Sequence, residues 1–266
     1  MRIYAEGLRF AYGSQPVLDG IDVDEESPGR ITALIGPNAA GKSTFLRCLA
    51  GLLHGKGAVR IGEHAVSSLR PAQRAQIVSY LPQDLPNTAA LTVFEAVLVA
   101  HRQTQPSWRV DQQDIEAVSG VLRRLGLEDL AVRNLSELSG GQRQLVAVGQ
   151  ALATEARVLL LDEPTSSLDL HHQLELLTLV ADLATEREMT VVVAIHDLNL
   201  AARFADRVLV LHGGRIAARG TPAEVLTPDL LRTVYRVEAK VLHDDTGIPL
   251  VVPLQAIAPY PTEVSR

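Results

Sequence analysis

A chain of 266 residues is long enough to bury a sizeable core, either as one large domain or as one domain with an inserted subdomain. Its formal net charge of −6, without a basic stripe, argues against binding along a nucleic acid, and its single cysteine, Cys48, excludes a disulfide framework within the chain. No apolar run approaches the roughly 20 residues of a membrane-spanning helix. We therefore expect a chain that crosses no membrane by itself, although docking on a membrane protein stays open.

The first 30 residues predict β-structure, because apolar and polar residues alternate around Ile3 and Ala5 and again around Ile21 and Val23. Tyr12 comes just before a glycine turn. An aromatic ring there could stack on a nucleotide base. From the residue alone, an ordinary half-buried tyrosine at a strand end is the better interpretation.

A predicted buried strand at residues 31–35 is followed by the pattern G-x-x-x-x-G-K-[ST] and then by an apolar helical pattern. In that context the backbone N–H groups of the loop and the helix N-terminus form a concave anion site. Lys42 adds a positive charge for β- and γ-phosphates, and the Ser43 hydroxyl suits Mg²⁺, which takes hard oxygen ligands. Cys48, in the helix, is better explained as a buried apolar residue than as a nucleophile. The predicted phosphate loop comprises Gly36, Pro37, Asn38, Ala39, Ala40, Gly41, Lys42 and Ser43.

Short strands are predicted at residues 58–61 and 77–81. Gln83 follows the second strand; a lone glutamine there is usually a surface residue, but its place before a new helical region makes it a candidate sensor. Residues 85–155 then show helical patterns, with a capping box that opens at Thr92 and an apolar stripe that stops before Gly126. We predict an α-helical insertion in an α/β domain.

Residues 138–142, Leu-Ser-Gly-Gly-Gln, precede an apolar helical run. Ser139 and Gln142 have the spacing of a capping box, so a plain capped helix start is one interpretation. Gly140 and Gly141 would weaken such a helix, which favours a functional reason for them. Two glycines let a ligand approach closely, and the positive end of a helix favours an anion.

Two apolar runs, residues 158–161 and 191–195, are typical of central parallel strands. The first ends at Asp162 and Glu163, and the second ends at His196. Ligands bind at the carboxyl edge of open parallel sheets, so we expect Asp162 to hold Mg²⁺ and Glu163 to polarise an attacking water. His196 can hydrogen-bond a γ-phosphate at the same edge. An Asp-Glu pair in another context is often only a solvated turn.

The order of these segments resembles the ATP-binding subunits of ABC transporters from residue 1 to about residue 252. The matching segments are GPNAAGKST at 36–44, Gln83, LSGGQ at 138–142, Asp162 with Glu163, Asp169 and His196, of which LSGGQ is the most specific. The resemblance implies an α/β fold: the ABC ATPase form of the P-loop NTPase fold, with an N-terminal antiparallel β-subdomain and an inserted α-helical subdomain. It implies a single ATP-binding domain over residues 1–266, with the helical subdomain at about 85–155 and a C-terminal extension at about 223–266.

The resemblance also implies an ATPase that uses ATP and Mg²⁺. It assigns catalytic roles to Glu163, His196 and Lys42, and metal-binding roles to Ser43, Gln83 and Asp162. Tyr12 would stack on adenine, contrary to the interpretation from the residue alone. The implied nucleotide-binding set is Tyr12, Gly36, Pro37, Asn38, Ala39, Ala40, Gly41, Lys42, Ser43, Thr44, Gln83, Ser139, Gly140, Gly141, Gln142 and Asp169.

The partners implied by the resemblance are a second copy of this chain, transmembrane permease subunits and, indirectly, a substrate-binding protein, with no nucleic acid. Two copies would bind two ATP molecules between them, so that Ser139, Gly141 and Gln142 serve the nucleotide held by the other copy. ATP-driven closure would reach the membrane subunits through the region around Gln83. The implied location is peripheral, at the cytoplasmic face of the inner cell membrane.

One residue departs from the family pattern. The family often has glycine where this chain has Ala39, and alanine tolerates that position only if φ is negative there. We therefore expect a negative φ at Ala39 and an intact phosphate cradle.

The finer resemblance is to importers of ferric siderophores, haem and cobalamin. It rests on the segment LTVFEAVLVAHR, on the run that follows Ile195 and on the tail. Ferric siderophore uptake is favoured, while haem and cobalamin stay open because the cargo never touches this subunit. A soluble ABC-type ATPase usually carries two cassettes or a long coiled coil, and an exporter cassette is often fused to membrane helices; the sequence has neither. LSGGQ and His196 argue against a kinase or GTPase, and the complete set of candidate catalytic residues argues against a non-catalytic binding module.

Overall fold

A six-stranded sheet forms the centre of the computed structural model, which describes residues 1–25, 28–83, 91–103 and 109–257. Five of its strands run parallel, and the edge strand β10 pairs antiparallel with β9. The strands in spatial order are β10 (Arg215–Gly220), β9 (Arg207–His212), β3 (Arg30–Ile35), β8 (Thr190–Ala194), β7 (Val158–Asp162) and β6 (Val78–Leu81). The predicted apolar strands at 31–35, 158–161 and 191–195 all lie in this sheet.

The two faces of the central sheet border two separate apolar cores, because side chains alternate along each strand. Leu160 and Val192 belong to the core shared with α1 (Lys42–Leu49) and the N-terminal strands. Their neighbours Leu161 and Val193 belong to the core on the opposite face, toward the larger helices. Burial on both faces explains why these strands are apolar throughout rather than alternating with polar residues.

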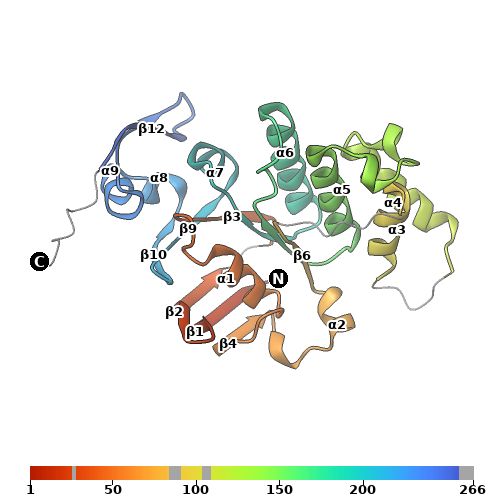
Figure 1. Ribbon diagram of the computed structural model, residues 1–266, viewed down its shortest axis with the longest axis horizontal. Coiled ribbons are helices and arrows are strands. Elements are labelled where there is room, and N and C mark those ends of the chain that lie inside the picture. Colours follow the sequence, from red (N-terminus) through yellow and green to blue (C-terminus); the bar gives the residue numbers. More distant parts are fainter. Residues whose placement is uncertain (26–27, 84–90, 104–108, 258–266) are drawn as a thin grey trace, which may run out of the picture.

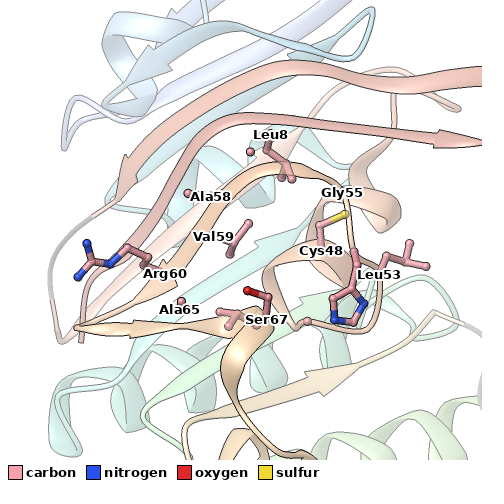
Figure 2. Close-up of a pocket in the computed structure, with 13 residues that line it drawn as sticks. Leu8, Cys48, Leu53, Gly55, Ala58, Val59, Arg60, Ala65 and Ser67 are labelled. Atoms are coloured by element: carbon pink, nitrogen blue, oxygen red, sulfur yellow. The ribbon is translucent and has the colours of Figure 1, made fainter.

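A four-stranded antiparallel sheet packs beside α1, as predicted for the N-terminal subdomain (Figure 1). Its strands in spatial order are β2 (Gln15–Glu25), β1 (Ile3–Tyr12), β4 (Lys56–Ile61) and β5 (His64–Ala65). A cavity of about 220 Å³ lies where the end of α1 meets β4, with Cys48 at its wall (Figure 2). Cys48 is buried, as predicted, and burial raises the pKa of its thiol to about 11.

The inserted helical subdomain contains α3 (Val93–Arg102), α4 (Gln112–Arg124) and α5 (Gly140–Ala153), at one end of the molecule in Figure 1. The predicted capping box at Thr92 is present: its hydroxyl accepts a hydrogen bond from the backbone N–H of Glu95. Residues 85–90, where the subdomain was predicted to begin, lie outside the described residues.

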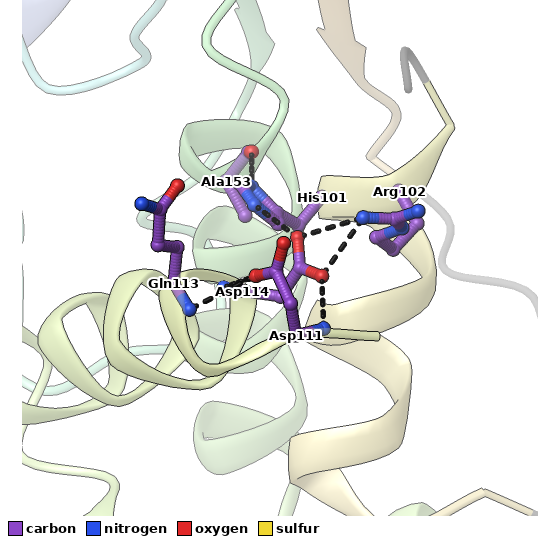
Figure 3. A network of polar contacts seen from close by, with 6 residues as sticks. All are labelled: His101, Arg102, Asp111, Gln113, Asp114 and Ala153. Atoms are coloured by element: carbon purple, nitrogen blue, oxygen red, sulfur yellow. Dashed lines mark hydrogen bonds and ion pairs between the residues drawn. The ribbon is translucent and has the colours of Figure 1, made fainter. Parts of the chain in front are cut away.

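An ion pair buried between α3 and α4 ties this subdomain together (Figure 3). One guanidinium nitrogen of Arg102 donates to both carboxylate oxygens of Asp114, at 2.9 and 2.8 Å. His101 extends the network by a contact of its Nε2 with Asp114 and of its Nδ1 with the carbonyl of Ala153 on α5. A charged pair in an apolar interior is tolerated when its partners hydrogen-bond each other, as Arg102 and Asp114 do, although the buried Nε of Arg102 has no hydrogen-bond partner among the described residues.

The chain closes with a hairpin that docks on the parallel domain. Asn199 makes the connection: its side chain accepts from the backbone N–H of Val251 at 2.7 Å and donates to the carbonyl of the same residue at 3.3 Å. The hairpin consists of β11 (Val237–His243) and β12 (Pro249–Ala256); residues 258–266 lie outside the described part. In the described residues no helix has the length and apolar character needed to cross a membrane. The remaining helical elements are η1 (Val66–Ser68), α2 (Pro71–Ala75), η2 (Glu128–Leu130), η3 (Leu135–Glu137), α6 (Leu170–Glu186), α7 (Leu198–Phe204), α8 (Pro222–Val225), α9 (Pro228–Leu230) and η4 (Leu231–Tyr235).

Candidate active site

The phosphate loop runs from the end of β3 to the start of α1 and needs glycine at both ends. Gly36 has φ 151°, and a Cβ there would lie 2.1 Å from the carbonyl oxygen of Leu211. Gly41 caps α1 with φ 102°, and a Cβ there would lie 3.1 Å from the side chains of Val17 and Leu18. Neither position accepts a larger residue without moving neighbouring atoms, which explains the two fixed glycines of the pattern.

Lys42 folds back under this loop. Its Nζ donates to the carbonyl oxygens of Gly36 at 3.0 Å and Pro37 at 3.3 Å, and the side chain is buried. Burial lowers the pKa of Lys42, while the nearby carboxylates of Glu163 and Asp162 act in the opposite direction. The cradle is therefore formed and carries its cation at the centre.

The expected backbone conformation of Ala39 is wrong. Its φ is +61°, in the left-handed region, rather than negative. The neighbouring glycines fix the course of the loop, so the residue at position 39 must follow it whether or not it has a Cβ. For an alanine this conformation costs roughly 1–2 kcal/mol. The cradle is nonetheless intact, since Lys42 makes both of its bonds to the loop.

Asp162 lies at the carboxyl end of β7 and is fully buried. Its Oδ1 accepts a hydrogen bond from the Ser43 hydroxyl at 3.0 Å, and its Oδ2 accepts one from the Tyr80 hydroxyl at 3.1 Å. Burial raises the pKa of Asp162, and these two donors oppose the rise. The structure thus joins two predicted metal-binding residues that are 119 positions apart in the sequence.

Glu163 is the point where three predicted residues meet. Gln83 Nε2 donates to its Oε2 at 2.9 Å, and His196 Nε2 makes an ion-pair contact with its Oε1. Glu163 has φ 54°, a strained conformation for a residue with a side chain. Its backbone is fixed on both sides, because its N–H donates to Ala194 and its carbonyl accepts from the Ser166 hydroxyl.

An open cavity of about 420 Å³ brings together the phosphate loop, Gln83, Glu163 and His196. The residues that line it are Val17, Asn38, Ala39, Ala40, Gly41, Lys42, Ser43, Thr44, Gln83, Glu163 and His196. Most of its wall is polar backbone, a cation and carboxylate or amide side chains, which suits a charged phosphate chain rather than an apolar ligand.

Other predicted residues lie away from this cavity. Tyr12, half exposed at the end of β1, packs edge-on against Phe10 at 4.9 Å between ring centroids. Ser139 and Gln142 form the expected capping box at the start of α5, where Ser139 Oγ accepts from the Gln142 N–H at 3.2 Å. Asp169 caps α6, where its carboxylate accepts from the His172 N–H at 3.0 Å.

The glycines of the LSGGQ segment are accessible. A Cβ on Gly140 would meet nothing within 4 Å, and one on Gly141 would lie 3.3 Å from the carbonyl oxygen of Ser167. Among the described residues, no atom outside the helix itself lies over Gly140, and Gly141 borders the turn before α6.

Sequence reasoning missed two residues at this site. Tyr80 is not predicted, because a single tyrosine in a short apolar strand has the pattern of an ordinary core residue. Tyr235, at the end of η4, reaches the start of the phosphate loop: burial raises its pKa, and a hydrogen bond with the backbone of Gly36 opposes the rise. The sequence indicates a C-terminal extension, but no sequence signal connects it to the phosphate loop.

The chain is similar to known proteins over nearly its whole length. The family model described as ABC transporter matches residues 21–166. The ferric enterobactin transport ATP-binding protein FepC of Escherichia coli (strain K12) is 37% identical over 265 residues, covering 97% of this chain and 96% of that protein. The hemin import ATP-binding protein HmuV of Streptomyces coelicolor is 43% identical over 251 residues, covering 94% of this chain and 89% of that protein. A solved metal-chelate type ABC transporter in an inward-facing conformation gives a TM-score of 0.80 at 30% identity, covering 96% of this chain and 98% of that one.

Proposed function

Because this chain belongs to the ABC transporter family and is an ATPase that hydrolyses ATP for transport, we propose that it drives an importer of iron–siderophore complexes. The observation that carries the catalytic part is the convergence of the phosphate loop, Glu163, Gln83 and His196 on one polar cavity, with the buried Asp162 bonded to Ser43 behind its wall. The cargo is supported by the similarity to the ferric enterobactin protein and to the metal-chelate transporter. Similarity to the hemin import protein supports haem as the second candidate.

The phosphate chain of ATP would lie in the loop between Gly36 and Thr44. The backbone N–H groups and the N-terminus of α1 attract its negative charge, and Lys42 supplies a cation from below. The carbonyls that now hold the Lys42 ammonium keep it at the centre of the cradle, so it needs little movement to reach the β- and γ-phosphates.

The donor set of the site fits Mg²⁺, which prefers oxygen ligands. The Ser43 hydroxyl and the Asp162 carboxylate are 3.0 Å apart beside the phosphate loop. The amide nitrogen of Gln83 is bonded to Glu163, which leaves the amide oxygen as the atom that can face a cation. Bound there, Mg²⁺ would neutralise charge on the phosphates.

Glu163 would act as the general base that orients and polarises the attacking water. Gln83 holds one carboxylate oxygen and His196 holds the other, so the carboxylate cannot rotate freely. Each oxygen has two lone pairs, and one on each stays available for water. The His196 side chain is 44% exposed, which suits the predicted bond to a γ-phosphate.

A second copy of this chain would complete the site. Ser139, Gly140, Gly141 and Gln142 form an accessible helix start that lies away from their own phosphate loop. In a face-to-face pair each LSGGQ segment would cover the γ-phosphate of the ATP held by the other copy, and Asp169 would lie at the same interface. Tyr12 would stack on the adenine of the ATP in its own chain, where half of its surface is exposed.

The proposed assembly contains two transmembrane permease subunits and, outside the membrane, a substrate-binding protein. This chain would sit peripherally at the cytoplasmic face of the inner membrane, with the region around Gln83 passing the closure motion on to the permease.

A pull-down of the full chain from detergent-solubilised native membranes tests the importer proposal. We expect a polytopic membrane protein together with a substrate-binding protein. The binding protein is then titrated with a ferric siderophore, haem and cobalamin, and the tightest ligand identifies the cargo. Recovery of ribosomes or nucleic-acid enzymes alone would overturn the importer proposal and leave a soluble ATPase.

A further inference from the structure

Asp162 is held on both of its oxygens, and only one of the two donors belongs to the phosphate loop. Ser43 donates to Oδ1, whereas Tyr80 donates to Oδ2 from the neighbouring strand. Strands β6 and β7 pair in parallel with Tyr80 opposite Leu160, so the phenol ring reaches forward along the sheet to the end of β7. The bond is 3.1 Å long and is made in a largely apolar surrounding.

Arg47 fixes the direction of this hydrogen bond. It lies in the last turn of α1, and its Nε donates to the Tyr80 hydroxyl at 3.2 Å. A guanidinium carries donors only, so the hydroxyl must act as acceptor toward Arg47. The single proton of Tyr80 is then left for Asp162. If the Tyr80 hydroxyl rotated away from the carboxylate, its proton would lose its acceptor and point toward the Arg47 cation.

Arg47 also interacts with a second tyrosine. Tyr80 makes the largest contribution to raising the pKa of Arg47, and Tyr12 on β1 adds a smaller one. A cation in the last turn of α1 also interacts favourably with the negative end of the helix dipole. The chain of hydrogen bonds from Arg47 through Tyr80 to Asp162 thus reaches the candidate metal site from the last turn of α1.

We propose that Tyr80 is a positioning residue for the metal site: its hydroxyl, oriented by Arg47, locks the Asp162 carboxylate in the orientation that Mg²⁺ requires. The inference rests on the proposed role of Asp162 toward Mg²⁺. Partners that hold a metal-binding carboxylate typically change metal affinity by about 10–100-fold when they are removed.

The test replaces Tyr80 with phenylalanine, which deletes the hydroxyl and keeps the buried ring. Affinity of the full chain for a fluorescent ATP analogue is measured in EDTA and across a Mg²⁺ titration. In EDTA, we expect Y80F to bind the nucleotide with the affinity of wild type, within about twofold. In the Mg²⁺ titration, we expect the Mg²⁺ concentration at the midpoint of the rise in nucleotide affinity to be about tenfold higher for Y80F. The matched control is Y4F, which removes an exposed phenol bonded to Glu6 and should change neither value.

A second variant covers the case in which Y80F fails to fold, as judged by thermal unfolding. R47M leaves the Tyr80 hydroxyl in place but removes the group that orients it, so it should raise the Mg²⁺ requirement in the same direction. In the double variant the effects should be less than additive, since both act through one bond.

Two outcomes overturn the proposal. Y80F could be folded and show an unchanged Mg²⁺ requirement, or it could weaken nucleotide binding equally with and without Mg²⁺, which would indicate structural support alone. D162N separates this failure from failure of the metal site. If D162N shifts the Mg²⁺ requirement and Y80F does not, Tyr80 has no positioning role; if neither does, the assignment of Asp162 is wrong as well.

Discussion

Replacing Ala39 by glycine should stabilise the protein, because Ala39 has φ +61° and an exposed side chain without packing to lose. Relief of the left-handed alanine gains roughly 1–2 kcal/mol. Glycine also has greater conformational freedom in the unfolded chain, which lowers the free energy of unfolding by about 0.4–1 kcal/mol. The net gain is about 0.5–1 kcal/mol, equivalent to about 1–3 °C in Tm for a chain of this size.

The neighbouring residue provides a control of opposite sign. Ala40 is 9% exposed and its φ is not positive, so Ala40→Gly relieves no strain and removes a buried methyl group. That variant should be less stable by about 1–2 kcal/mol, from lost burial and from chain entropy. Both variants are measured by thermal unfolding of the full chain without nucleotide.

Nucleotide affinity refines the comparison. The cradle is already formed with Ala39 in place, so Ala39→Gly should change the affinity for ATP by less than about threefold, or 0.65 kcal/mol. A lower Tm for Ala39→Gly would refute the strain argument. A large gain in ATP affinity would mean that the alanine keeps the loop from its binding conformation.

Three further predictions concern the helical subdomain, the tail and the cysteine. The backbone N–H of Asp111 and the guanidinium of Arg102 hold the pKa of Asp114 below its usual value, so its stabilising effect is complete at neutral pH and is lost as pH falls through the lowered pKa. Asp114→Asn should therefore lower Tm at pH 7 and lose less stability than wild type on acidification below about pH 4; parallel Tm–pH curves would contradict this. Tyr235→Phe removes the hydroxyl that interacts with the backbone of Gly36 and should lower the free energy of unfolding by about 1 kcal/mol and weaken ATP binding by a few-fold. An unchanged ATP affinity would show that the tail does not support the phosphate loop. The buried thiol of Cys48 should react with a maleimide far more slowly in the native protein than in urea, and equal rates would show that the helix end opens readily.

The parts of the site that the sequence predicted are those with a strong local cause. The glycine loop must turn sharply between a buried strand and a helix, and residues at the carboxyl ends of parallel strands share one edge. These two rules were enough to expect Ser43, Asp162 and Glu163 together, and the structure places Ser43 within 3.0 Å of Asp162.

The parts that the sequence did not predict depend on the order and register of strands. Tyr80 reaches Asp162 only because β6 is the neighbour of β7, and nothing in the short run around Tyr80 specifies that neighbour. The predicted negative φ of Ala39 is wrong because it rests on the backbone preference of alanine alone. The course of the loop between Gly36 and Gly41 decides the φ at this position. Tertiary context decides both cases, and a local pattern cannot carry it.

The most direct test of the central claim, an ATP site built from two copies of this chain, is the association state of Glu163→Gln. Loss of the carboxylate should stop hydrolysis and leave the phosphate cradle unchanged, since Lys42 and Ser43 do not depend on it. Light scattering with ATP and Mg²⁺ should show a stable dimer that disappears with ADP, and that does not form when Ser139→Ala is added. The matched control, Glu188→Gln, alters an exposed carboxylate and should hydrolyse ATP as wild type does. A Glu163→Gln protein that binds ATP, stays monomeric and still hydrolyses it at the normal rate would contradict the account.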